Sequence, residues 1–176
     1  RLYPLPSAVK LTTGKLFDNT SRLRTLAGQD CAHMGKVACF AEYAVLPEAG
    51  CIPAPASLDF PQMALIGCSV TTGVGAVVFN ARVQPGDSVA VIGCGGVGLN
   101  VLQGARLAGA TTIVAVDVKD AALAFARKFG ATHTVNARTE DAVSRVQALT
   151  GGGAHFAFEA YGGGATTKMA VDMVRK

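Results

Sequence analysis

The chain has 176 residues, of which 50% are hydrophobic and 16% are charged. This composition is typical of a globular protein with a sizeable core and excludes an intrinsically disordered chain. The 16 basic and 12 acidic residues are scattered, so the formal charge of +4 forms no basic patch for nucleic acid, and we expect no apolar run of about 20 residues that could span a membrane.

Cysteine usage and the chain ends narrow the class of protein further. Five cysteines are an odd number in a chain above the size of a disulfide scaffold, which favours free thiols in a reducing cytoplasm. No signal peptide is expected. The chain starts at Arg1 rather than Met, and its last residues have the pattern of a helix, so we expect it to be a piece of a longer protein.

The first part of the chain, residues 1 to about 57, is predicted to be irregular, with prolines, polar turns and short apolar runs. Residues 40–48, FAEYAVLPE, alternate apolar and polar side chains as a half-buried strand does. The candidate core residues of that strand are Phe40, Tyr43 and Val45. We therefore expect a strand-containing segment here.

Residues 57–81 then take on a helical pattern. Asp59 is predicted to cap the helix, with Pro61 in its first turn. Gly67 and Gly73 interrupt the apolar run, and glycine is unfavourable in a helix interior. We therefore predict two shorter helices rather than one long one.

From Pro85 onward, apolar strands alternate with helical segments. Strands are predicted at 88–93, 111–117, 132–137 and 154–160, and helices at 96–109, 120–130, 139–152 and 164–174, the third of them capped by Thr139. Strands and helices that alternate at these lengths are typical of βαβ units with right-handed crossovers. The predicted fold class is therefore α/β, with a parallel, doubly wound sheet.

The most informative stretch is VAVIGCGGVGLNVLQGARLAG, which contains G-x-G-x-x-G at Gly93, Gly95 and Gly98. The motif comes directly after a predicted strand and opens a helix, which is the context that gives it meaning. Gly93 permits a tight turn, Gly95 lets the backbone approach a pyrophosphate, and Gly98 allows close packing of helix on strand. Free N–H groups at the helix start favour a phosphate. Together these residues predict a dinucleotide site.

An acidic residue completes this pattern. Asp117 ends the second predicted strand, where a carboxylate can accept hydrogen bonds from the adenosine ribose and would repel a 2′-phosphate. NAD is therefore expected over NADP, although Lys119, two residues on, weakens that preference. The alternative is that the glycines form only a tight turn and that Asp117 only caps a helix. Cys94, inside the loop, is expected to be a small filler rather than a reactive thiol.

Two segments in order, GCSVTTGVGAV and VQPGDSVAVIGCGGVGLNVLQGARLAGATTIVAVDV, resemble the zinc-dependent medium-chain alcohol dehydrogenases. The resemblance runs from about CFAEYAVLPE to FAFEAYGGG and is strongest from Ile66 to Ala137. It implies a dinucleotide-binding Rossmann domain over residues 66–176, which is C-terminally incomplete because it reaches only a fourth strand. Residues 1–65 would then be the remnant of a β-rich, GroES-like catalytic domain.

The resemblance also implies roles for single residues. Cys68 matches one of three protein ligands of a catalytic zinc, and Thr72 matches a threonine that packs against the nicotinamide, so both are candidate catalytic residues. The matches to cofactor-binding positions, besides Thr72, are Gly93, Gly95, Gly96, Val97 and Gly98 in the pyrophosphate loop, Asp117 at the ribose, and Ala160 and Tyr161 at the end of the fourth strand. Two positions depart from the family: Ala122 stands where a lysine is common, and His155 where an aspartate is common.

A catalytic zinc needs more ligands than this sequence offers, since such sites use three protein ligands and an open position. The resemblance places the other cysteine and histidine ligands, and a cysteine-rich lobe for a structural zinc, before Arg1. The local pair Cys31 and His33 has a C-x-H spacing that a turn could bring together, but the matching stretch of the family is structural. His133 and His155 are expected to be structural or solvated.

The resemblance implies an oxidoreductase that transfers a hydride between a zinc-bound alcohol and NAD, and so interconverts small alcohols and aldehydes. The parent protein is expected to be a cytoplasmic homodimer or homotetramer, and this chain alone to be inactive. Two alternatives stay open: a non-catalytic dinucleotide-binding module, and a zinc-independent relative similar to the quinone reductases. Gly67, Cys68 and Asp117 favour the zinc-dependent interpretation.

Overall fold

The computed structural model describes residues 14–16, 18–33, 42–44, 46, 48 and 51–176. The chain forms two compact units, Arg1–Pro55 and Ala56–Lys176. Among the described residues, all the named helices and strands lie in the second unit. That unit therefore holds the elements predicted from residue 57 onward.

The first unit contributes turns and one isolated antiparallel bridge among its described residues, between Arg24 and Asp30. Of the strand predicted at 40–48, residues 40, 41, 45 and 47 lie outside the described residues, and Phe40 and Val45 are among them. Tyr43 lies in a bend and is 91% exposed. The prediction of Tyr43 as a core residue is therefore wrong, because the described chain around it forms no strand that would turn its ring into a core.

One continuous helical segment runs from Phe60 to Ala81, so the prediction of two shorter helices is wrong. The segment consists of α1 (Phe60–Leu65), the π-helical η4 (Ile66–Val70), α2 (Thr71–Gly75) and the π-helical η5 (Ala76–Ala81). Asp59 caps it as predicted, with its side chain accepting a hydrogen bond from Gln62 N. Gly73 does not break the helix because it is a packing position. A Cβ there would lie 2.6 Å from Asn100 Cβ, which belongs to α3 (Gly96–Leu107).

The same segment corrects the expectation about apolar runs. It has 22 residues, and its most apolar 18-residue stretch has a mean hydropathy of 1.6, which by length and composition alone is enough to cross a membrane. Only 11% of its most apolar stretch is buried, and Phe60, Leu65 and Phe79 are exposed. Val77, in contrast, is fully buried and lies against Gly104 of α3. One side of the segment is therefore part of the core of the second unit.

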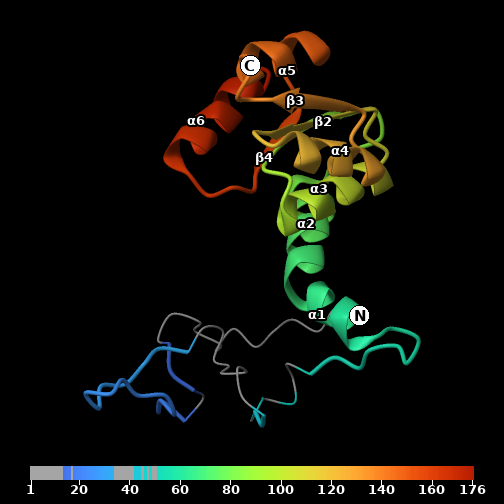
Figure 1. The fold of residues 1–176 in the computed structure, drawn as a ribbon. Helices are drawn as coiled ribbons and strands as arrows, with labels where there is room; N and C mark the ends of the chain where they lie inside the picture. Colours follow the sequence, from blue (N-terminus) through green and yellow to red (C-terminus); the bar gives the residue numbers. More distant parts are fainter. Residues whose placement is uncertain (1–13, 17, 34–41, 45, 47, 49–50) are drawn as a thin grey trace. The chain divides into compact units, whose positions relative to one another are not determined.

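Four parallel strands form one sheet in the order β3-β2-β1-β4. The strands are β1 (Ser88–Ile92), β2 (Thr112–Asp117), β3 (His133–Asn136) and β4 (Phe156–Glu159), and the helices around them are α3, α4 (Asp120–Lys128), α5 (Ala142–Leu149) and α6 (Gly164–Met173) (Figure 1). Each element falls within its predicted range, so the α/β fold with a doubly wound parallel sheet is confirmed. Strand order reverses between β1 and β4, and ligands of such sheets bind at this switch point.

Each face of the sheet carries its own apolar core. β1 is buried along its whole length, as expected for a parallel strand covered on both faces. One face packs on α3 and α4 through side chains that include Val91, Leu102, Ile113 and Leu123. The other face packs on α5 and α6 through side chains that include Ile92, Val114, Val146 and Met173. These two cores fix the carboxyl ends of the strands, where the predicted site residues lie.

The start of α5 differs from the prediction. Asp141, not Thr139, is the N-cap: its Oδ1 accepts hydrogen bonds from Val143 N at 3.1 Å and from Ser144 N at 3.4 Å. The Ser144 side chain also donates to this carboxylate, and together these bonds hold the pKa of Asp141 below its usual range. A carboxylate bonds the first N–H groups of a helix better than a threonine hydroxyl does. The helix therefore begins after Asp141 rather than after Thr139.

Candidate functional site

The glycine motif forms the turn from β1 into α3. Gly93 has φ +91°, in the left-handed region, and its N–H donates to Val116 O at 2.8 Å. A Cβ on Gly98 would lie 1.8 Å from Gly93 O, so only glycine lets α3 come this close to the turn. Gly95 is the exposed N-cap of α3, and a Cβ there would meet nothing within 4 Å. The turn is closed where the helix packs and open where a ligand would approach.

Asp117 lies beside this turn, at the end of β2. Its Oδ2 accepts a hydrogen bond from Cys94 N at 2.8 Å. Its Oδ1 accepts from Val118 N at 2.7 Å and from Lys119 N at 3.0 Å. The carboxylate therefore joins the glycine turn to the chain after β2. Sequence spacing placed Asp117 at a strand end, but its bond to the turn could be seen only in three dimensions.

The chain after β4 forms the facing wall. A Cβ on Gly93 would lie 3.1 Å from Tyr161 N and 3.2 Å from Ala160 O. Ala160 N donates to Ile92 O at 2.8 Å, so Ala160 extends the pairing of β4 with β1. Tyr161 is 75% exposed. The two residues that the resemblance assigned to the strand end therefore lie directly against the glycine turn.

A cavity of about 530 Å³ opens between these segments, at the carboxyl ends of β1, β2 and β4. Its lining comprises Ile92, Gly93, Cys94, Gly95, Val116, Asp117, Val118, Lys119, Ala122, Ala137, Ala160, Tyr161, Thr166 and Met169. Five of the predicted cofactor residues are in this set. Gly96, Val97 and Gly98 form the first turn of α3 beside it. Ala122, where the resemblance led us to expect a lysine, leaves this part of the wall apolar. Ligand cavities of this size, mostly apolar with a few fixed polar groups, suit small molecules and cofactors.

Cys68 and Thr72 lie one helical turn apart on the segment before the sheet, and both are exposed. Neither lines the cavity. A Cβ on Gly96 would lie 3.6 Å from the Cβ of Ser69, the residue after Cys68. This helical segment therefore runs beside the start of α3. Among the residues that the structure describes, no three His, Cys, Asp or Glu side chains gather as a metal site would require. Cys68 would therefore need its partner ligands from elsewhere.

The local pair Cys31 and His33 forms no such centre either. His33 is buried, and its Nε2 lies 3.1 Å from Ser21 Oγ and 3.2 Å from Arg22 N. These bonds hold a turn of the first unit together. His133 is exposed on β3, and its ring Nδ1 lies 2.9 Å from Thr132 Oγ1. Its surroundings are thus solvated, as predicted, and those of His33 are structural.

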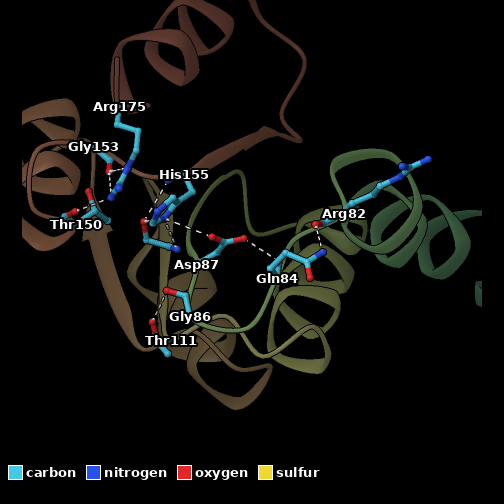
Figure 2. Close-up of polar contacts among 10 residues, drawn as sticks. Arg82, Gln84, Gly86, Asp87, Thr111, Thr150, Gly153, His155 and Arg175 are labelled. Atoms are coloured by element: carbon cyan, nitrogen blue, oxygen red, sulfur yellow. Dashed lines mark hydrogen bonds and ion pairs between the residues drawn. The ribbon is translucent and has the colours of Figure 1, made fainter.

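His155 belongs to a polar network at the opposite, amino edge of the sheet (Figure 2). Its Nδ1 lies 2.9 Å from Ser88 N, 2.8 Å from Ser88 Oγ and 3.9 Å from Asp87 Oδ1. Because a backbone N–H can only donate, Nδ1 is the acceptor. In a hydrolytic triad, the serine and the aspartate bond to opposite nitrogens of the histidine ring. Here Ser88 and Asp87 lie on the same nitrogen, and Ser88 is buried, so this network is not such a triad. The network ties the start of β1 to the start of β4.

Cys94 lies in the glycine turn and is 6% exposed. Burial, with a smaller contribution from the charge of Asp117, raises the pKa of its thiol to about 12. At pH 8, about four pH units lower, only about one thiol in 10⁴ is ionised. Because the thiolate is the nucleophile, Cys94 should be inert, as the sequence predicted.

We expect a thiol reagent at pH 8 to modify Cys94 only after unfolding. A Cys94→Ala variant should have the same number of rapidly reacting thiols as the parent chain in the folded state. In denaturant it should have one reactive thiol fewer than the parent. Cys68→Ala is the matched comparison: Cys68 is exposed, so its loss should lower the number of rapidly reacting thiols by one. A fast-reacting Cys94 would mean that the turn opens to solvent.

Comparison with known proteins adds to these findings. A family profile described as "Zinc-binding dehydrogenase" matches residues 96–176. S-(hydroxymethyl)glutathione dehydrogenase of Saccharomyces cerevisiae is 38% identical over 165 residues, which cover 90% of this chain and 43% of that protein. Alcohol dehydrogenase class-3 of Cereibacter sphaeroides is 41% identical over 134 residues, covering 75% of this chain and 36% of that protein.

Solved structures match as well. An alcohol dehydrogenase zinc-binding domain protein from Burkholderia ambifaria superposes with a TM-score of 0.81 at 36% identity, over 92% of this chain and 44% of that one. Benzyl alcohol dehydrogenase from Acinetobacter calcoaceticus gives a TM-score of 0.78 at 31% identity, over 89% and 44% of the two chains. The chain therefore spans less than half the length of these relatives.

Proposed function

Because this chain belongs to the zinc-dependent medium-chain alcohol dehydrogenases, we propose that it supplies the dinucleotide-binding part of an enzyme that interconverts small alcohols and aldehydes with NAD. Residues 66–176 would be this Rossmann domain, and residues 1–65 the remnant of the catalytic domain. The observation that carries the proposal is the hydrogen bond of 2.8 Å between Cys94 N in the glycine turn and Asp117 Oδ2. It brings together, at one cavity, the turn that would bind the phosphates and the carboxylate that would bind the ribose.

The residues at this cavity fit NAD. Gly95 leaves the N-terminus of α3 open, so the N–H groups of Gly96, Val97 and Gly98 can bind the pyrophosphate. Asp117 would accept a hydrogen bond from the ribose while it holds the turn. Ala160 and Tyr161 would wall the other side of the cofactor. Nicotinamide supplies hydride transfer when it is bound. The task of these residues is to fix its orientation and exclude water.

For zinc, the described residues offer a single fitting ligand. We propose that Cys68 is that ligand and that its partners lie outside the described residues. Zinc at such a site polarises an alcohol oxygen. Cys68 would contribute a thiolate, and Thr72, one turn further along the same exposed face, would pack beside the nicotinamide. No proton relay is assigned to this chain.

The preference for NAD over NADP is tested by Asp117→Asn. The amide keeps one oxygen that can accept from Cys94 N and removes the negative charge that would repel a 2′-phosphate, while its NH2 group replaces the oxygen that accepts from Val118 N and Lys119 N. We expect NADH binding to weaken by about tenfold, the value of one charge-assisted hydrogen bond, and NADPH binding to stay equal or tighten. Fluorescence titration with both nucleotides measures this, with Asp172→Asn, which neutralises a surface carboxylate of α6 paired with Lys168, as the control. An equal loss for both nucleotides would contradict the assignment.

The enzymatic proposal itself is tested on the protein encoded by the complete reading frame. Zinc content, NADH binding and oxidation of primary and aryl alcohols should all be found, in a homodimer or homotetramer located in the cytoplasm. A folded, zinc-free protein that binds NADH without turnover would instead be a non-catalytic module. The relatives include an S-(hydroxymethyl)glutathione dehydrogenase and a benzyl alcohol dehydrogenase, so both compounds belong in the substrate panel.

A further inference from the structure

We propose that Glu159, a residue that the sequence did not single out, is a positioning residue for the nucleotide: its carboxylate fixes the turn after β4 against the glycine turn. The inference rests on the proposed function, because it assumes that the cavity binds a dinucleotide. Glu159 itself does not line the cavity, whereas Ala160, Tyr161 and Thr166 do. Its effect on a ligand would therefore pass through these neighbours.

Three donors converge on one oxygen of this side chain. Glu159 Oε1 accepts hydrogen bonds from Tyr161 N at 2.9 Å, from Gly162 N at 2.8 Å and from Thr166 Oγ1 at 2.9 Å. The first two donors belong to the turn, and the third belongs to the first turns of α6. One carboxylate oxygen thus ties the end of β4, the turn and the helix together.

Besides the bonds to Glu159, the turn is held at Gly163 O, which lies 2.8 Å from Thr166 Oγ1 and accepts from Thr167 Oγ1 and Thr167 N, each at 2.9 Å. Gly162 has φ +94°, which glycine adopts without strain but which leaves the backbone free to take other conformations. Gly162, Gly163 and Gly164 follow one another in the sequence, and consecutive glycines lose much conformational entropy on ordering. The bonds to Glu159 therefore fix the first part of the turn, at Tyr161 and Gly162.

That conformation matters because it sets the width of the cavity. Tyr161 N lies 3.1 Å and Ala160 O lies 3.2 Å from the position of a Cβ on Gly93. The glycine turn and the β4–α6 turn are therefore already in close contact, and a shift of either would change the surface that a pyrophosphate and a ribose meet. A preformed site loses less entropy on binding, so its affinity is higher.

The charge on Glu159 supports the same role. The hydrogen bond from Gly162 N, opposed by burial and reinforced by Thr166 and Tyr161, lowers the pKa of this carboxyl group. The folded protein therefore favours the ionised form, and the contribution of Glu159 to stability is present above the pKa of the unfolded chain and lost as the pH falls through the lower, folded value. At neutral pH the carboxylate is ionised, and bonds to a carboxylate are stronger than bonds to a neutral oxygen.

The test compares four variants by NADH titration and amide hydrogen exchange, in the full chain. Glu159→Ala should weaken NADH binding by about tenfold and expose the Gly162 amide to exchange. Glu159→Gln keeps an oxygen at Oε1 and should restore binding to within about threefold of the parent. Thr166→Val removes one of the three donors and should weaken binding by about threefold. Thr167→Val, whose hydroxyl bonds Gly163 O rather than Glu159, is the matched control and should bind as the parent does.

The outcomes separate this inference from the proposed function. If the parent chain does not bind NADH, the proposed function fails and the variants are not needed to show it. If the parent binds but Glu159→Ala binds equally well, or Glu159→Gln loses as much as alanine does, positioning by Glu159 is wrong. Should Glu159→Ala fail to fold, with the Val91 amide of β1 also losing protection, the comparison of Thr166→Val with Thr167→Val still decides, since equal affinities would overturn the inference.

Discussion

Gly98→Ala is expected to abolish nucleotide binding and to destabilise the second unit. A Cβ at this position would lie 1.8 Å from Gly93 O and 2.9 Å from Gly93 C. Both are backbone atoms of the turn, so no side chain can rotate to make room. Overpacking of this kind costs about 3 kcal/mol of stability. If α3 withdraws instead, the N–H groups that face the phosphates move with it, and a misfit of similar free energy corresponds to about 100-fold in the Kd for NADH.

Chemical or thermal unfolding and NADH titration measure the two effects of Gly98→Ala separately. Gly164→Ala is the matched control, because a Cβ at the start of α6 meets nothing within 4 Å. Alanine is the better helix former, so this control should be as stable as the parent or slightly more so. A Gly98→Ala variant that binds NADH normally would mean that the pyrophosphate does not lie on this turn.

Cys68→Ser is expected to have the largest effect on turnover in the complete enzyme. Serine keeps the size of the side chain but replaces a thiolate, the ligand that zinc prefers, with a neutral hydroxyl. Metal content at the catalytic site should fall close to zero. Loss of a Lewis acid that contributes several kcal/mol to the transition state should lower kcat by about 10³-fold. NADH binding should remain, since Cys68 does not line the nucleotide cavity.

Metal analysis, alcohol turnover and NADH titration on the same preparation check each part of this prediction. Cys31→Ser makes the same chemical change beside His33, the other pair considered for metal binding. We expect this variant to keep its zinc and its activity, because His33 Nε2 bonds Ser21 and Arg22 in the first unit. Full turnover in Cys68→Ser would show that Cys68 is a packing residue. Zinc loss in Cys31→Ser would show that the metal site lies in the first unit.

The sheet and its helices could be predicted because their signals are local. β1 is a run of five buried residues, and α3 begins at glycines and ends where Gly109 takes a left-handed φ of +82°. Composition and periodicity report such features directly. The helical segment from Phe60 to Ala81 was predicted wrongly for a related reason. Glycine has a local propensity to interrupt a helix, but here Gly73 is placed by a contact with Asn100, far along the chain.

The residues of the candidate site also differ in whether a local sequence signal could reveal them. Gly93, Gly95, Gly98 and Asp117 carry a spacing that the sequence displays. The structure brings Gly93, Gly95 and Asp117 to one cavity, with Gly98 in the first turn of α3 beside it. Glu159 has no such spacing, because its role depends on the directions of three donors in a turn that glycines shape. A signal was available in the acidic residue at a strand end followed by three glycines, which requires something to order the turn.

If the chain binds NAD as proposed, the bond from Cys94 N to Asp117 has a consequence for changing the cofactor preference, whether by natural divergence or by design. The same carboxylate that would repel NADP also holds the turn proposed to bind the phosphates, so a substitution here alters both properties unless, as in Asp117→Asn, the new side chain keeps an acceptor for Cys94 N. A substitution that admits NADP but leaves Cys94 N without an acceptor loosens the turn for either nucleotide. Routes to NADP that remove this acceptor therefore need an accompanying change that supplies a new one, and the order in which the two changes arise decides whether the intermediate protein binds either nucleotide.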